Sequence, residues 1–288
     1  MNLTSKETIQ ALLQRGRTKP NKTMGQNFLI DARVLEKIIQ AAAISKEDTV
    51  LEVGPGIGTL TQALAQQAKQ VIAIEKDPAM IAILKQTLAG IQNVQIIPGD
   101  VRQVSHYPLP KNYSVVANIP YYLTSHLIRS FLEEPPNGQA PKEILLMVQK
   151  EVAQRICAKP PKMSLLAVSV QWYAKASIVA IIPRGSFWPA PAVDSAIIKI
   201  TPLQQTPSLP PNQFFRVVKA GFSHPRKQLA NNFSQAFQEN KETIGQWLQQ
   251  QDIQPNQRAQ TLSVAQWEAL AKSYSQLERH LHQGIVVQ

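Results

Sequence analysis

The chain has 288 residues, with 30 Lys and Arg against 19 Asp and Glu, so its formal net charge is +11. An apolar fraction of 44% excludes a wholly disordered chain, and a single cysteine excludes an intramolecular disulfide framework. The excess of cations indicates a polyanionic partner, most often nucleic acid or an anionic surface.

No targeting segment is recognisable. Residues 1–17 contain charged side chains and no apolar run of signal-peptide length. The longest mostly apolar stretch, residues 165–182, is interrupted by polar residues, so we interpret it as buried core and not as a membrane span. We therefore expect a soluble, cytoplasmic protein that does not bind a membrane.

Strand and helix patterns alternate along the first two thirds of the chain. A basic loop (residues 19–31) precedes a helical pattern at residues 31–43. The strands expected after it are residues 50–53, 71–74, 94–97, 114–117 and 144–148, with helices at 60–68, 78–88 and 123–132. This alternation predicts a parallel α/β sheet with helices on both faces, closed by an antiparallel hairpin of residues 178–182 and 196–200.

A proline-rich break follows at residues 201–212, and the sequence beyond it has helical periodicity. We therefore predict two domains: residues 1–204, which begin with a basic arm, and residues 205–288, a small all-helical domain.

A glycine motif marks the predicted cofactor site. Gly54, Gly56 and Gly58 follow a strand and precede a helix, where glycines allow the backbone to approach a ligand closely. Glu75, at the end of the second strand, can bind both hydroxyls of a ribose. Asp100, after the third strand, can accept a hydrogen bond from an adenine amino group. The Gly-x-Gly-x-Gly spacing is similar to that of S-adenosylmethionine-dependent methyltransferases, not to the dinucleotide fingerprint.

The predicted acceptor site follows the fourth strand. Asn118-Ile119-Pro120-Tyr121 resembles the motif of methyltransferases that modify exocyclic amino groups of bases. The Asn118 side-chain oxygen and the Ile119 carbonyl can accept the two hydrogens of adenine N6, which aims the nitrogen lone pair at a methyl donor. Pro120 fixes the turn, and the Tyr121 ring can stack on a base that has left its own stack.

Five motifs in this order resemble the ribosomal RNA adenine N6,N6-dimethyltransferase family, which acts on small-subunit RNA. They are residues 25–31, 51–61, 118–125, 187–195 and 226–232. The resemblance covers residues 25–270. It implies a Rossmann-like methyltransferase fold with a helical C-terminal domain. It also implies dimethylation of two adjacent adenosines in a 3′-terminal hairpin loop, in a precursor of the small ribosomal subunit. The motifs and this resemblance imply that the first domain binds a cofactor, S-adenosylmethionine, and that the second binds RNA.

The resemblance also implies roles for single residues. The cofactor-binding residues carried over by motif are Asn27, Leu29, Gly54, Gly56, Glu75, Asp100 and Asn118. Phe187 would form the second face of an aromatic clamp on the adenine, opposite Tyr121. The alternative for Phe187 is simple core packing.

Basic residues occur in two groups that could contact RNA phosphates. They are Arg15, Arg17, Lys19 and Lys22 near the N-terminus, and Lys219, Arg226 and Lys227 in the second domain. The histidines show no metal-ligand spacing, so we expect no metal site. We expect a monomer.

Three alternatives remain. The first is the related large-subunit RNA adenine dimethyltransferase of the macrolide-resistance type. The second is a non-catalytic RNA-binding assembly or transcription factor of the same fold, against which the acidic residues and Asn118 argue. The third, a dinucleotide oxidoreductase, fits the glycine spacing poorly.

Overall fold

The computed structural model describes residues 1–107, 109–204 and 208–283, and the chain forms two compact units. The first comprises Met1–Gln154 and Ala174–Pro202, and the second comprises Arg155–Tyr173 and the chain from Leu203 onward. Residues 155–173 therefore belong to the second unit, although a first domain of residues 1–204 was expected to include them. The reason lies in packing: Trp172 stacks on Phe214 with ring centroids 4.0 Å apart, within the core of the helical unit.

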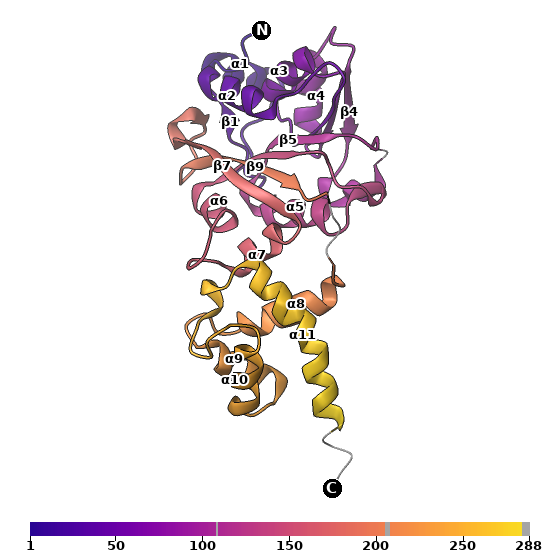
Figure 1. The fold of residues 1–288 in the computed structure, drawn as a ribbon. Helices are drawn as coiled ribbons and strands as arrows, with labels where there is room; N and C mark the ends of the chain where they lie inside the picture. The colour runs from indigo at the N-terminus through magenta and orange to yellow at the C-terminus, as the bar shows by residue number, and fades with distance from the viewer. Residues whose placement is uncertain (108, 205–207, 284–288) are drawn as a thin grey trace. The chain divides into compact units, whose positions relative to one another are not determined.

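The first unit is built on a seven-stranded sheet of order β4-β3-β2-β5-β6-β9-β7 (Figure 1). The strands are β2 (Thr49–Val53), β3 (Gln70–Glu75), β4 (Val94–Pro98), β5 (Ser114–Asn118), β6 (Ile144–Gln149), β7 (Ala174–Ile182) and β9 (Ser195–Pro202). The first five pair in parallel, whereas β9 pairs antiparallel with both β6 and β7. The predicted parallel sheet and its closing hairpin are thus confirmed.

The helices that accompany these strands are α1 (Lys6–Arg15), α2 (Ala32–Ala42), α3 (Thr59–Gln67), α4 (Pro78–Thr87), α5 (Thr124–Leu132) and α6 (Lys150–Ile156). The four predicted helices are confirmed as α2, α3, α4 and α5, whereas the sequence analysis did not predict α1 and α6. The cap residues explain two of the starts, because the Asp31 and Asp77 carboxylates accept hydrogen bonds from the first-turn amides of α2 and α4. Neighbouring strand residues such as Val50 and Leu51 are both fully buried, so the sheet is covered on both faces.

The N-terminal segment, expected as a basic arm, is a helix with a buried face. In α1, Ile9, Leu12 and Leu13 join a core cluster with Met80 and Ile83 of α4. Arg15 lies in the last turn of this helix and is exposed. A second, two-stranded sheet pairs β1 (Phe28–Leu29) with β8 (Phe187–Trp188), so two segments far apart in the sequence lie side by side.

Residues 165–182 are not one buried stretch, so that expectation is wrong for the second half. They form α7 (Leu165–Gln171) and β7, and in β7 Ile178, Val179 and Ile181 are 36%, 43% and 43% exposed. The strand is the last in the sheet, so no described strand pairs with its outer edge. No described helix is long and apolar enough to span a membrane.

The second unit is helical (Figure 1). Besides α7 it contains α8 (Pro211–Gly221), α9 (Leu229–Phe237), α10 (Lys241–Gln249) and α11 (Val264–Gln283). Its core is rich in aromatic side chains, with Phe233 in edge-to-face contact with both Trp247 and Trp267. A separate core of this kind allows the unit to be stable as a domain.

Candidate functional site

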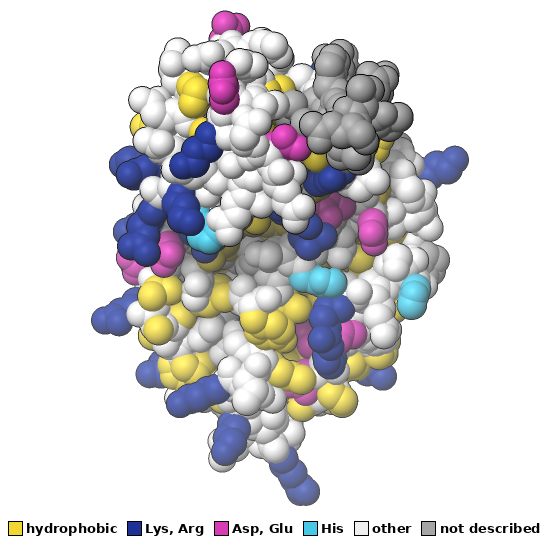
Figure 2. Space-filling model, turned by 90° about the horizontal axis from the view of Figure 1, so that it is seen from below, with side chains coloured by type: hydrophobic (Ala, Val, Ile, Leu, Met, Phe, Trp, Pro, Cys, Tyr) yellow, Lys and Arg dark blue, Asp and Glu magenta, His cyan; other side chains and the backbone are white. Residues whose placement is uncertain are grey.

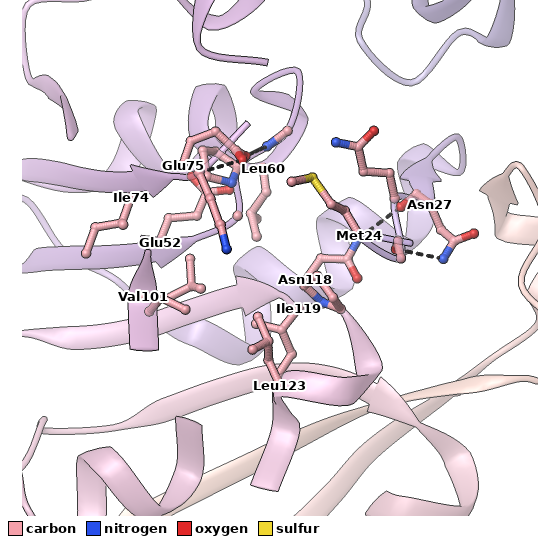
Figure 3. A pocket seen from close by; sticks show the side chains of 18 of the residues that line it. Met24, Asn27, Glu52, Leu60, Ile74, Glu75, Val101, Asn118, Ile119 and Leu123 are labelled. Carbon is pink, nitrogen blue, oxygen red and sulfur yellow. Dashed lines mark hydrogen bonds between the residues drawn. The ribbon is translucent and has the colours of Figure 1, made fainter. Parts of the chain in front are cut away.

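A pocket of about 1200 Å³, including the space open to solvent, lies at the carboxyl ends of β2, β3, β4 and β5 (Figure 3). It is lined by the glycine loop, by Glu75 and Asp100, by residues 118–123, by the N-terminal loop at residues 24–29 and by Phe187. Ligands of open α/β sheets bind at this edge. The structure therefore brings all the predicted cofactor and acceptor residues into one pocket of the first unit.

The glycine loop needs its glycines for backbone conformation. Gly54 and Gly56 have φ of +63° and +61°, in the left-handed region that side chains disfavour. The Gly56 amide donates a hydrogen bond to Oε2 of Glu75 at 3.1 Å. The loop is thereby tied to the end of β3, and Gly54 and Gly56 both line the pocket.

Glu75 is held by backbone amides on both sides. It is 7% exposed, and its Oε1 accepts hydrogen bonds from the amides of Lys76 and Asp77, each at 2.8 Å. Burial raises the pKa of the Glu75 carboxyl, and these backbone hydrogen bonds oppose the rise. The side chain therefore has a fixed orientation at the pocket wall, as recognition of vicinal hydroxyls requires.

Asp100 begins a 3₁₀ helix, η1 (Val101–His106), and accepts a hydrogen bond from the Arg102 amide. Its carboxylate also accepts hydrogen bonds from Nε and Nη2 of Arg102 and from Nζ of Lys76. The Arg102 guanidinium hydrogen bonds are the main reason that the pKa of Asp100 is held well below its usual range, with Lys76 adding to the effect. Asp100 is therefore an ionised acceptor at neutral pH.

Asn118 is the last residue of β5, and one hydrogen bond orients its carboxamide. Its Nδ2 donates to the carbonyl oxygen of Asn27 at 3.3 Å. The Oδ1 atom accepts no hydrogen bond from the residues that the structure describes, and the residue lines the pocket (Figure 3). Since the donor end of the amide is used, the acceptor end remains available to a ligand.

The N-terminal loop at residues 24–29 packs directly on residues 118–121, the predicted acceptor loop. Gly25 has a φ of +64°, and a Cβ added there would lie 3.2 Å from Cβ of Pro120. The Asn27 side chain donates a hydrogen bond to the Gly25 carbonyl at 3.0 Å, which stabilises the turn. Gly25 therefore permits the close approach that lets the Asn27 carbonyl reach Asn118.

Tyr121 and Phe187 both line the pocket, but their environments differ. The hydroxyl groups of Tyr121 and the fully buried Ser195 lie 2.8 Å apart in a hydrogen bond. Burial raises the pKa of the Tyr121 phenol, so the side chain remains neutral. Phe187 is 3% exposed and pairs with Leu29 across the β1–β8 sheet, so it packs in the core while touching the pocket.

Glu52 lines the pocket as well, although the sequence analysis did not select it. It is 2% exposed, and its Oε2 has no hydrogen-bond partner among the described residues. Burial raises the pKa of Glu52 to about 8, and the nearby Glu75 charge adds to the rise. A carboxyl group within the apolar strand β2 was the available signal, because such groups are rarely buried without a role.

The residues predicted to contact RNA lie outside the pocket lining. Arg15, Arg17, Lys19 and Lys22 are exposed on α1 and the loop after it, and Lys219, Arg226 and Lys227 are exposed in the helical unit. Lys and Arg side chains are exposed on the face shown in Figure 2. No group of three or more potential metal ligands occurs among the residues that the structure describes.

Three comparisons relate the chain to known proteins. The model of the family described as ribosomal RNA adenine dimethylase matches residues 17–276. A protein of Dehalococcoides mccartyi named ribosomal RNA small subunit methyltransferase A is 42% identical over 262 residues, which is 89% of each chain. A protein of the same name from Streptococcus pneumoniae is 38% identical over 94% of this chain and 97% of its own.

Two solved structures share the fold over most of the chain. A dimethyladenosine transferase from Plasmodium falciparum matches with a TM-score of 0.74 and 28% identity, over 86% of this chain and 97% of its own. The 23S rRNA methyltransferase ErmE matches with a TM-score of 0.70 and 25% identity, over 85% of this chain and 98% of its own. The Rossmann-like methyltransferase fold with a helical C-terminal part is thus confirmed.

Proposed function

Because the chain belongs to the ribosomal RNA adenine dimethylase family, we propose that it methylates N6 of two adjacent adenosines in a 3′-terminal hairpin loop of small-subunit ribosomal RNA. The product is N6,N6-dimethyladenosine. The observation that carries the proposal is the orientation of Asn118 at the pocket: its Nδ2 donates a hydrogen bond to the Asn27 carbonyl, while its Oδ1 accepts none from a described residue.

The methyl donor in this proposal is S-adenosylmethionine, and the residues of the pocket fit it. Glu75 would accept hydrogen bonds from the ribose hydroxyls, and Asp100 from the adenine amino group. The cofactor would also contact the backbone of four residues that line the pocket: Gly54, Gly56, Asn27 and Leu29. The unpartnered Oε2 of Glu52 is a buried acceptor that a cationic or hydrogen-bonding ligand would satisfy. When bound, this cofactor supplies a methyl group attached to a sulfonium, which an amine lone pair can displace.

The acceptor chemistry is mainly positioning. The N6 lone pair of adenine is delocalised into the ring, which makes this nitrogen a poor nucleophile. Hydrogen bonds from N6 to Oδ1 of Asn118 and to the Ile119 carbonyl would localise that lone pair and direct it to the methyl carbon. Pro120 would fix the turn, and Tyr121 and Phe187 would hold the extruded base between them. Transfer of the methyl group would leave the sulfonium as a neutral thioether, and the proton that N6 loses would pass to solvent.

The RNA would be bound through both units. We propose that Arg15, Arg17, Lys19 and Lys22 on the first unit, and Lys219, Arg226 and Lys227 on the second, neutralise phosphates. The substrate in this proposal is the RNA of a precursor small subunit. The protein would act as a monomer in the cytoplasm.

The second candidate function is methylation of large-subunit RNA, since the fold is shared with ErmE. The names of the curated relatives favour the small subunit. The test is incubation of the protein with tritiated S-adenosylmethionine and each purified, unmodified subunit in turn. We expect label in small-subunit RNA; label in large-subunit RNA alone would support the second candidate, and label in neither would contradict both.

A further inference from the structure

Tyr122 is the one exposed aromatic side chain among the residues whose side chains the structure describes. It is 63% exposed, whereas the other described Phe, Trp and Tyr side chains are buried or half-buried. It is also among the residues that line the pocket. An exposed apolar side chain needs no explanation by itself. An aromatic ring left in solvent only at the mouth of the functional pocket suggests a ligand there.

The two consecutive tyrosines have opposite environments. Both belong to the 3₁₀ turn η2 (Tyr121–Leu123) that leads into α5. Tyr121 is half-buried and bound through its hydroxyl to Ser195, whereas the Tyr122 hydroxyl makes no hydrogen bond with any described residue. One ring is therefore fixed inside the pocket, and the next remains outside, available for stacking.

A cation accompanies Tyr122 at the rim. The Arg102 side chain is 54% exposed, and Asp100 holds it through Nε and Nη2, so its position is fixed although it is in solvent. Asp100 raises the pKa of Arg102, mainly by accepting these hydrogen bonds. Arg102 and Tyr122 line the same pocket. The exposed Lys76 is bound to the same carboxylate. An aromatic ring beside oriented cations is the combination that binds an unpaired nucleotide.

We propose that Tyr122 and Arg102 form a second nucleotide subsite, which binds the RNA nucleotide next to the adenosine being methylated. The base stacks on the Tyr122 ring, and its phosphate meets the outward side of the Arg102 guanidinium. This inference rests on the proposed function, in which two adjacent adenosines are substrates. It gives the enzyme a place for a neighbouring base that would otherwise be unstacked in water while its partner occupies the inner pocket.

The test uses single-turnover methylation of RNA hairpins that each retain one acceptor adenosine. In one set the other adenosine is replaced by purine riboside, which keeps the stacking ring and lacks the amino group. In the matched set it is replaced by an abasic residue. Both members of the adenosine pair are substituted in turn. The proteins are wild type, Tyr122→Leu, which keeps an apolar side chain without a ring, and Tyr122→Phe, which keeps the ring.

With purine riboside as neighbour, we expect Tyr122→Leu to lower kcat/KM by about 10-fold for at least one of the two acceptors. Tyr122→Phe restores most of that loss. With the abasic neighbour, wild type and Tyr122→Leu should methylate equally slowly. Equal rates of wild type and Tyr122→Leu on every RNA would overturn the subsite. An equal loss with both neighbours would overturn it too, because Tyr122 would then serve the target base itself.

Failure of the proposed function has a different signature. If wild type methylates neither the hairpin that keeps both adenosines nor the small subunit, then the reaction assigned above is wrong, independently of the results with the Tyr122 variants. Cofactor affinity, measured by calorimetry without RNA, provides the folding control. A matching loss of that affinity in Tyr122→Leu would also contradict the subsite, since the side chain would then belong to the cofactor side.

Discussion

At the scale of single residues, the two ends of the Asn118 amide have different environments. The nitrogen is bound to the Asn27 carbonyl, and the oxygen is left at the pocket. In the proposed reaction, acceptor specificity would depend on this oxygen, whose position is fixed from the opposite side by a loop that packs closely on Pro120 at Gly25. Such preorganisation means that little reordering is needed when the base enters.

Removal of the Asn118 amide should therefore affect turnover far more than cofactor binding. For Asn118→Ala we expect kcat to fall about 100-fold, because one oriented polar group at a reacting atom is worth about that much. Asn118→Asp keeps an acceptor oxygen and should retain more activity than the alanine variant. Kinetics and calorimetric cofactor affinity, measured side by side, check this; equal losses in the two quantities would contradict the assigned role.

The buried Glu52 predicts a pH dependence of stability. Its pKa of about 8 in the folded protein lies above the ordinary value of 4.5, so the folded state retains a proton that the unfolded state releases. Its stabilising contribution is complete below pH 4.5 and is lost as the pH rises towards 8. Relative to Glu52→Gln, which cannot ionise, wild type should lose on the order of a few kcal/mol over that window. The Glu75 carboxyl is present in both proteins, so the comparison between them isolates the contribution of Glu52.

Denaturant unfolding of the ligand-free proteins at intervals between pH 4.5 and 8.5 provides the measurement. The free energy of unfolding of wild type minus that of Glu52→Gln should fall with rising pH and level off above pH 8. Parallel pH profiles for the two proteins would show that Glu52 is already ionised when the protein is folded.

At the scale of elements, one segment links the two sides of the site. Residues 183–195 contribute β8, which pairs with the N-terminal loop at β1, and end at Ser195, which binds the Tyr121 hydroxyl. The Asp194 carboxylate accepts a hydrogen bond from the Arg184 amide at 3.1 Å, which joins the two ends of this segment. The segment thus contacts both the loop around Asn27 and the acceptor loop.

The Ser195–Tyr121 hydrogen bond should orient the Tyr121 ring. We expect Ser195→Ala and Tyr121→Phe each to raise KM for RNA, with a smaller effect on kcat, because the ring stays but is less fixed. The double variant should be no worse than either single one, since both remove the same hydrogen bond. A double-mutant cycle in RNA methylation tests this. Additive losses would mean that Ser195 acts on something other than Tyr121.

The strand–helix alternation could be predicted because glycines, prolines and acidic caps mark its boundaries. Gly54 to Gly58 end β2, and Asp77-Pro78 begins α4. The exposure of β7 could not be predicted, because Ile178 and Val179 are apolar like core residues. Only the strand order shows that β7 is an edge strand. Glu52 was missed although a carboxyl group within an apolar strand was a local signal; that its Oε2 has no partner among the described residues depends on the packing around β2, which the sequence does not show.

At the scale of the whole molecule, the net charge of +11 is divided between two units. The candidate RNA contacts occur on both of them, and they are exposed. Phosphate neutralisation releases counterions, so affinity for RNA should depend on salt whichever arrangement the units adopt.

We expect log affinity for the RNA hairpin to fall linearly with log salt concentration. Changing Lys219, Arg226 and Lys227 together to Gln should make the slope shallower by about 0.7 for each lost phosphate contact. Lys37→Gln, an exposed change on α2, is the matched control and should leave the slope unaltered. Fluorescence anisotropy titrations at several salt concentrations provide the measurement, and a flat plot for wild type would contradict phosphate binding.

The most direct test of the central claim, that the pocket at Asn118 methylates adenine N6 in small-subunit RNA, is mass spectrometry of nucleosides. Unmodified small subunits are treated with S-adenosylmethionine and either wild type or Asn118→Ala, and the RNA is digested and mapped. The account predicts N6,N6-dimethyladenosine at two adjacent positions with wild type and almost none with the variant. Methylation of another atom or another base, or equal N6 methylation by both proteins, would contradict it.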